Sequence, residues 1–293
     1  MGDRSKIEWT DATWNPVLGC SKVSPGCDNC YAITMSRRIE TTGNEAYRGI
    51  TIRDDWTGLV RCLPERLDQP LRWKRPRRVF VNSMSDLFHP DVPPEFIARV
   101  WHVMERAEAH VFQILTKRPQ RMARWVQWYE TDDEFGEDFG PLPNVWLGTS
   151  IEENRYAFRA NHLRSTSAAV RFLSLEPLLG PLPALNLSAI DWVIVGGESG
   201  PGARPMHPDW VRDIRSRCQT AGVPFFFKQW GEWSWTYGGI PASAESVVLD
   251  NGAGAFQKMW RVGKRAAGRI LDGCTWDEMP RVHSGSREAD RDE

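Results

Sequence analysis

Three cysteines lie close together near the start of the chain, in a segment that is otherwise rich in Ser, Pro, Gly, Asp and Asn. Cys20 is followed by Cys27 and Cys30, and the next Cys or His along the sequence is Cys62. Three thiolates can hold a four-iron cluster and leave its remaining iron open to a small molecule. The spacing therefore predicts an iron–sulfur site with an open position, which would make the protein an enzyme.

Other interpretations of these cysteines stay open. A tetrahedral zinc would need a distant fourth ligand, such as Cys62, His89 or Cys274. A disulfide needs an oxidising compartment, whereas the first residues contain no apolar signal stretch, so we expect a cytoplasmic protein with reduced thiols. Burial as small hydrophobic residues is disfavoured by the polar turn residues between the cysteines.

Composition limits the classes of partner. The 37 Lys and Arg nearly balance the 38 Asp and Glu, so any surface for nucleic acid must be local. No apolar run approaches the ~20 residues that span a bilayer, and we expect no membrane association. The 15 Trp are spread along the chain, which favours packing over stacking on bases.

Short apolar runs rich in β-forming residues alternate with amphipathic stretches from Arg78 onward, which is typical of repeated βα units around a parallel sheet. Helical periodicity marks 93–109 and 208–221. With a first strand at 15–19, the pattern predicts an α/β fold, a partial or irregular (β/α) barrel of about six to seven parallel strands. The later strands are expected at 79–82, 111–115, 145–149, 170–174, 192–195 and 223–227.

The chain reads as one barrel domain over residues 1–280. Residues 41–69 carry mixed charge and no motif, and we expect an irregular insertion there. Residues 131–140 read as an acidic surface connector. The tail at 281–293 lacks apolar periodicity and is expected to be disordered.

Polar residues follow each predicted strand, and the carboxyl ends of barrel strands are where active sites form. Carboxylates after three different strands would point toward one mouth, although strand ends are also polar simply because chains exit into water. The candidates are Ser83, Ser85, Asp86, Thr116, Lys117, Ser150, Glu152, Glu176, Glu198, Lys228 and Gln229.

Two segments are locally basic. Arg72–Arg78 holds five cations in seven residues, and Lys117–Arg124 adds further Lys and Arg. Such segments neutralise phosphates in nucleic-acid-binding proteins, although a solvated charged face is an equally good explanation. We therefore expect DNA or RNA as a possible partner of these segments.

The three-cysteine loop after a first strand, followed by Tyr31 and a βα barrel, resembles the radical S-adenosylmethionine enzymes. Nearly end to end, the chain is similar to a family of phage and bacterial proteins with this three-cysteine motif, which is close in layout to spore photoproduct lyase. The motifs that carry this likeness are Ser85-Asp-Leu-Phe88, Leu115-Thr-Lys-Arg-Pro119, Leu175-Glu-Pro-Leu-Leu-Gly180, Gly196-Gly-Glu-Ser199 and Leu271-Asp-Gly273.

The resemblance implies a [4Fe-4S] cluster on Cys20, Cys27 and Cys30, with S-adenosylmethionine on the fourth iron. Reductive cleavage would then give a 5'-deoxyadenosyl radical, with an external electron donor and a nucleic acid or nucleotide as substrate. The cofactor contacts that it implies are Glu198, Ser83 or Asp86 for the amine, Ser150 and Glu152 for the ribose, Arg164 or Lys117 for the carboxylate and Tyr31 near the adenine, with Glu176 also in the site.

One departure concerns the cysteine spacing. Six residues separate Cys20 from Cys27, where most radical S-adenosylmethionine enzymes have three. A longer turn can still reach a cluster, because a chain spans up to ~3.3 Å per residue. Two other functions remain open, namely a zinc-stabilised nucleic-acid-binding or metal-dependent nuclease-like protein and a noncatalytic partner in a phage or mobile-element assembly.

Overall fold

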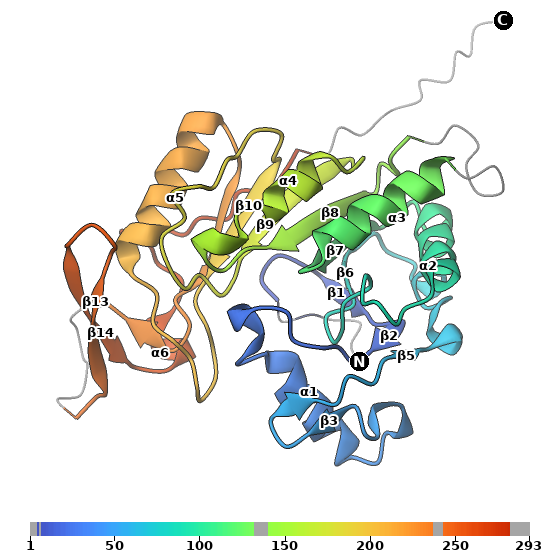
Figure 1. The fold of residues 1–293 in the computed structure, drawn as a ribbon, viewed down its shortest axis with the longest axis horizontal. Helices are drawn as coiled ribbons and strands as arrows, with labels where there is room; N and C mark the ends of the chain where they lie inside the picture. Colours follow the sequence, from blue (N-terminus) through green and yellow to red (C-terminus); the bar gives the residue numbers. More distant parts are fainter. Residues whose placement is uncertain (1–4, 6, 132–139, 237–242, 282–293) are drawn as a thin grey trace, which may run out of the picture.

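A curved sheet of seven parallel strands forms the centre of the protein in the computed structural model, which describes residues 5, 7–131, 140–236 and 243–281. The strands are β1 (Ala12–Trp14), β6 (Arg78–Val81), β7 (Val111–Thr116), β8 (Val145–Ser150), β9 (Val170–Leu175), β10 (Trp192–Gly196) and β11 (Phe225–Gln229). They are ordered as they occur in the chain, and the sheet curls through 202° into a half-barrel (Figure 1). This confirms the predicted α/β partial barrel.

Helices connect most of the strands: α2 (Pro94–Arg106), α3 (Pro119–Thr131), α4 (Arg159–Arg164) and α5 (Pro208–Ala221), with the short η5 (Asn154–Tyr156) before α4. Both α2 and α5 begin with a proline, whose fixed backbone angle suits the first helical position. Gly222 ends α5 in a left-handed conformation. The two predicted helices are therefore confirmed, although α2 ends short of Ala109.

Two hydrophobic clusters occupy the two faces of the sheet, because successive strand residues point to opposite sides. Val79 and Val81 belong to the larger cluster, which also contains apolar side chains of the helices. Phe80, between them in the chain, belongs to an aromatic cluster with Trp9, Trp146, Phe172, Trp192 and Phe226. Trp14, Trp146 and Trp192 are fully buried, which confirms packing as the role of these tryptophans.

The first strand lies earlier than expected. Ala12–Trp14 pairs with β6, whereas β2 (Val17–Leu18) leaves the sheet and pairs antiparallel with β5 (Arg61–Cys62). Pro16 separates the two strands and has no N–H to donate to a ladder. The prediction of one strand over 15–19 was therefore wrong, although the cysteine loop still follows the start of the sheet.

The segment that follows the cysteine loop forms a small lobe beside the sheet, at the bottom of Figure 1. After η1 (Pro25–Cys27) and α1 (Tyr31–Glu40) come only short elements. They are η2 (Glu45–Tyr47), β3 (Thr51–Ile52), β4 (Asp55–Trp56) and η3 (Pro64–Arg66), and η4 (Pro70–Arg72) then leads toward β6.

A second sheet, which the sequence did not predict, lies near the end of the chain. It is antiparallel and contains β12 (Trp233–Ser234), β13 (Ser246–Asp250) and β14 (Phe256–Arg261), followed by α6 (Lys264–Ala267). Within the described residues, no helix combines the length and the apolar character needed to cross a membrane. The predicted acidic connector and tail lie almost wholly outside these residues.

Candidate functional site

The three-cysteine loop lies at the carboxyl ends of the half-barrel strands. Its start forms a parallel bridge from Gly19 to Ser85, which follows β6. Farther along, the loop and the residue after it reach residues that follow β6, β8 and β10. These contacts are Gly26 N to Glu152 Oε1 at 3.4 Å, Asn29 Nδ2 to Glu198 Oε2 at 3.0 Å and Tyr31 Oη to the Ser83 carbonyl oxygen at 2.6 Å. The loop is thus fixed to several strand ends at once.

Cys20 lies against a cation. Arg118 Nη1 approaches Cys20 Sγ at 3.7 Å, and the same guanidinium pairs with Asp86 at 2.8 Å. Burial raises the pKa of the Cys20 thiol to about 12, Asp86 adds to this shift, and Arg118 opposes it. Without a metal this thiol is protonated at neutral pH, so binding of a metal at its sulfur must release a proton.

Cys27 and Cys30 share the electrostatic environment of Cys20. A charge on Cys27 acts on both other thiols, and burial raises the pKa of Cys30 while Lys117 opposes that shift. An added Cβ at Gly26 would lie 3.3 Å from Lys117 Cε and 3.2 Å from Glu152 Cδ. A side chain at this position would require Lys117 and Glu152 to shift slightly from where they lie over the loop.

Each of four predicted carboxylates pairs with a basic residue. The pairs are Asp86–Arg118 at 2.8 Å, Glu152–Arg159 at 2.9 Å, Glu176–Lys228 at 2.7 Å and Glu198–Arg204 at 2.7 Å. Such pairs satisfy the charge of a carboxylate that has been withdrawn from water. The four carboxylates therefore hold the mouth of the half-barrel together through ion pairs. Among the described residues, the ammonium group of Lys117 forms no ion pair.

Glu198 and Arg204 hold the second half of the cysteine loop. Glu198 accepts from Asn29 and from the side chain and backbone of Arg204, which also donates to the Pro25 carbonyl oxygen at 2.8 Å and pairs with Asp28 at 3.4 Å. Burial alone would raise the pKa of Glu198, but the hydrogen bonds from Arg204 and Asn29 bring it below the ordinary value. The carboxylate is therefore ionised and engaged.

The donors are not arranged around one metal ion. Within the part of the chain that the structure describes, no three His, Cys, Asp or Glu side chains form a group suited to a single ion. His89 uses both ring nitrogens, on Ser21 Oγ and on the Asp91 backbone N. Cys62 lies in β5, and Cys274 is exposed. A cubane cluster asks for a different arrangement, because each thiolate binds a different iron.

The other predicted residues fall into two groups. Ser83 Oγ donates to Asn15, and the Ser150 carbonyl oxygen accepts from Arg159, so both lie in the network around the mouth. Arg164 is different, because it ends α4 and donates to the carbonyl oxygens of Asn186 and Ser188. No described contact joins Arg164 to the cysteine loop.

The two basic segments differ in their surroundings. In Lys117–Arg124, Arg118 is bound to Asp86 and Ser21, and Arg121 donates to the Val92 carbonyl oxygen at 2.7 Å. Arg72–Arg78 instead leads into the amino end of β6, at the opposite end of the strands from the cysteine loop. Its exposed cations are Arg72, Lys74 and Arg75.

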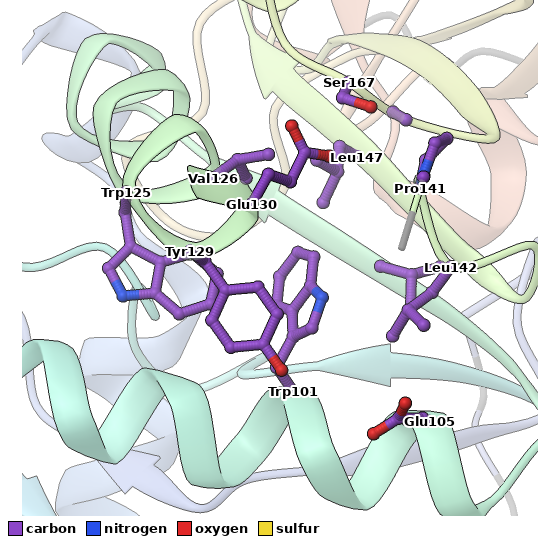
Figure 2. Close-up of a pocket in the computed structure, with 13 residues that line it drawn as sticks. Trp101, Glu105, Trp125, Val126, Tyr129, Glu130, Pro141, Leu142, Leu147 and Ser167 are labelled. Atoms are coloured by element: carbon purple, nitrogen blue, oxygen red, sulfur yellow. The ribbon is translucent and has the colours of Figure 1, made fainter. Parts of the chain in front are cut away.

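An apolar pocket lies elsewhere, between α2, α3 and the amino end of β8. Trp101, Trp125 and Tyr129 line it together with Leu142 and Val145. Figure 2 shows the three rings grouped between the helices, where Trp125 stacks on Tyr129 with ring centroids 5.0 Å apart. The rings pack on one another, and the pocket is a feature of helix packing at the end of the sheet away from the cysteines.

A family model described as "protein of unknown function (DUF5131)" matches residues 4–280. The chain belongs to the DUF5131 family. Neither the curated proteins nor the solved structures contain a significant match.

In this DUF5131 protein, the residues that sequence reasoning missed are the partners of the predicted ones. Asn29, Arg159 and Arg204 carried no signal, because no spacing in the sequence links them to the carboxylates that they contact. Arg118 lies in the Leu115–Pro119 motif, but as part of a basic segment it suits phosphate binding and a solvated charged face equally well. Its place directly before α3, whose first residue is Pro119, could have suggested an inward position at the strand end.

Proposed function

We propose that this protein is an iron–sulfur enzyme of the radical S-adenosylmethionine type. The observation that carries the proposal is the position of the three-cysteine loop, which is fixed across the carboxyl ends of the strands by contacts to Ser83, Glu152 and Glu198. In a parallel (β/α) barrel this end is where reactants bind. A structural metal has no need of that position.

The number of thiols suits a cluster with one open iron. The loop supplies three cysteines, all of them free thiols, and three thiolates leave one iron of a four-iron cluster without a protein ligand. Among the described residues, Ser24 Oγ inside the loop is buried without a hydrogen-bond partner, and the half-buried Lys117 forms no ion pair. A bound anionic group would provide a partner for both.

Each part of the site has a task under this proposal. Cys20, Cys27 and Cys30 would hold the cluster, which when bound supplies one electron for cleavage of the sulfonium of S-adenosylmethionine. Lys117 would bind a carboxylate as a charge-assisted donor. The ribose and amine contacts that sequence reasoning gave to Glu152, Glu198 and Asp86 would have to share those carboxylates with their arginines. An external one-electron donor completes the reaction.

Anaerobic reconstitution with iron and sulfide tests the proposal. We expect about four irons per chain, as one cubane requires, and formation of 5'-deoxyadenosine from S-adenosylmethionine with dithionite as the electron source. Cys27→Ala should lose both, whereas the matched control Cys274→Ala, at an exposed cysteine outside the loop, should keep both. A protein that binds one zinc and no iron would contradict the proposal and favour the zinc-stabilised alternative.

A nucleic acid as substrate is a separate part of the proposal. Its main support is Arg72, Lys74 and Arg75, which are exposed together in one segment. In the second segment Arg118 and Arg121 are engaged inside the protein, and Arg124 is exposed. The three cations of the first segment lie at the amino end of β6. A nucleic-acid strand bound there would have to pass around the sheet to reach the cysteines.

Salt dependence of binding tests this part. Each phosphate contact adds roughly 0.9 to the slope of log affinity against log salt for duplex DNA. A variant with Gln at Arg72, Lys74 and Arg75 should lower that slope by about 2–3 and weaken binding of a labelled duplex. An affinity of the wild type that is the same at low and high salt would argue for a small-molecule or protein substrate.

A further inference from the structure

Arg118 is a cation in direct contact with Cys20, and it is held in place on several sides. Its Nη1 contacts Cys20 Sγ at 3.7 Å and Asp86 Oδ2 at 2.8 Å. Its Nη2 donates to the carbonyl oxygen and to the hydroxyl of Ser21, both at 2.9 Å. The side chain is only 11% exposed, so its charge acts in a region with little water to screen it.

The partners of Arg118 are themselves fixed. Asp86 Oδ1 accepts from Thr116 Oγ1 at 2.7 Å and from the backbone N of Phe88 at 2.9 Å. Ser21 Oγ lies 2.8 Å from Nε2 of the buried His89. Because Nδ1 of His89 accepts from the Asp91 backbone N, Nε2 is the nitrogen that carries the hydrogen and donates to Ser21. The guanidinium is therefore preorganised against the sulfur of Cys20.

A Ser and a His in contact suggest a nucleophile, but this pair is not one. His89 donates to Ser21 Oγ, as does Arg118, so the hydroxyl oxygen receives two hydrogens and has no base to take its own proton. A general base would need a free lone pair on the nitrogen that faces the hydroxyl. The arrangement serves to orient Arg118 instead.

We propose that Arg118 is a positioning and tuning residue that raises the reduction potential of a cluster bound at Cys20. The inference rests on the proposed function, because it requires a cluster on the three cysteines. Hydrogen bonds to ligand sulfurs and the net charge nearby set such potentials. Reduction adds an electron, and a fixed cation at the sulfur stabilises the more negative state. Loss of the cation would also leave Asp86 uncompensated, which shifts the potential in the same direction.

A redox titration of the reconstituted protein, followed by electron paramagnetic resonance with dithionite as reductant, tests the inference. Arg118→Gln should lower the midpoint potential by about 59 mV or more, which corresponds to at least a tenfold change in the one-electron equilibrium constant. Arg118→Lys keeps the positive charge but loses the forked guanidinium, so its midpoint potential should fall by less than that of Arg118→Gln. Arg124→Gln, an exposed change of the same charge on α3, should leave the potential where it is in the wild type.

The outcomes separate the two proposals. If the wild type binds no iron, the proposed function fails. If Arg118→Gln binds iron fully and titrates at the wild-type potential, the inference alone fails. Should Arg118→Gln lose its cluster, Asp86→Asn decides, since removal of a negative charge must raise the potential. An unchanged potential in Asp86→Asn would overturn the inference.

Discussion

Replacement of either partner in the Glu152–Arg159 pair should destabilise the protein strongly, because the pair is fully buried. The Glu152 side chain is 0% exposed and the Arg159 side chain is 5% exposed, with Oε2 and Nη1 2.9 Å apart. Arg159 also donates to the Ser150 carbonyl oxygen and covers the ring of Tyr156. Neither ion can regain water when its partner is removed.

The expected magnitudes follow from what each variant leaves behind. Removal of one partner from a buried ion pair costs roughly 3–5 kcal/mol. Glu152→Gln should lie near 3 kcal/mol on that scale, because the amide oxygen can still accept from Arg159. Arg159→Met should lie near 5 kcal/mol, because among the described residues it leaves the buried carboxylate with only the long contact from Gly26. The loss of unfolding free energy in the double variant should be about 2–3 kcal/mol smaller than the sum of the losses in the two single variants.

Urea unfolding followed by tryptophan fluorescence measures these free energies, and the four proteins form a double-mutant cycle. For domains of 150–250 residues each kcal/mol corresponds to about 2–4 °C, so Glu152→Gln should also lower the melting temperature by roughly 6 °C or more. Single effects below about 1 kcal/mol, or effects that simply add in the double variant, would refute a buried and coupled pair.

Two further predictions concern packing and pH. Gly148→Ala should cost about 1–3 kcal/mol, because the added Cβ would lie 2.5 Å from the ring of Phe172. Gly180→Ala, with nothing within 4 Å, is the matched control and should be neutral or slightly stabilising in the same unfolding assay. Glu198→Gln should cost about 2 kcal/mol at neutral pH. Since hydrogen bonds with Arg204 and Asn29 lower the pKa of Glu198 below its ordinary 4.5, the stability that it contributes is present above that value and is lost as pH falls through the folded-state pKa. The loss of unfolding free energy caused by Glu198→Gln should therefore become smaller in unfolding curves recorded from neutral to acidic pH. A loss that is the same at every pH would contradict a lowered pKa of Glu198.

The strands were predictable because a sheet buried on both faces needs short, continuous apolar runs, and each run from Val79 onward became a strand. The start of the sheet was not, because Ala12–Trp14 is too short to show a pattern and Pro16 divides it from the next apolar residues. The strands β13 and β14 were not predicted, because their apolar residues do not form one buried face. Val248 and Phe256, for example, are exposed.

Strand ends predicted which carboxylates would gather at the mouth, because parallel strands bring their carboxyl ends to one edge. The basic residues that pair with these carboxylates could not be predicted. Arg159 contacts Glu152, and Arg204 contacts Glu198, because of turns whose shape the sequence does not reveal. A basic segment such as Lys117–Arg124 reads the same whether its cations face solvent or, like Arg118, a buried carboxylate.

Iron and sulfide analysis combined with electron paramagnetic resonance of the reduced protein tests the central claim most directly. We predict about four irons and four sulfides per chain, with a spectrum that changes when S-adenosylmethionine is added and disappears in Cys27→Ala. A chain that takes up no iron under anaerobic reconstitution, or whose cluster spectrum is the same with and without S-adenosylmethionine, would contradict a cluster with an open iron on the three-cysteine loop.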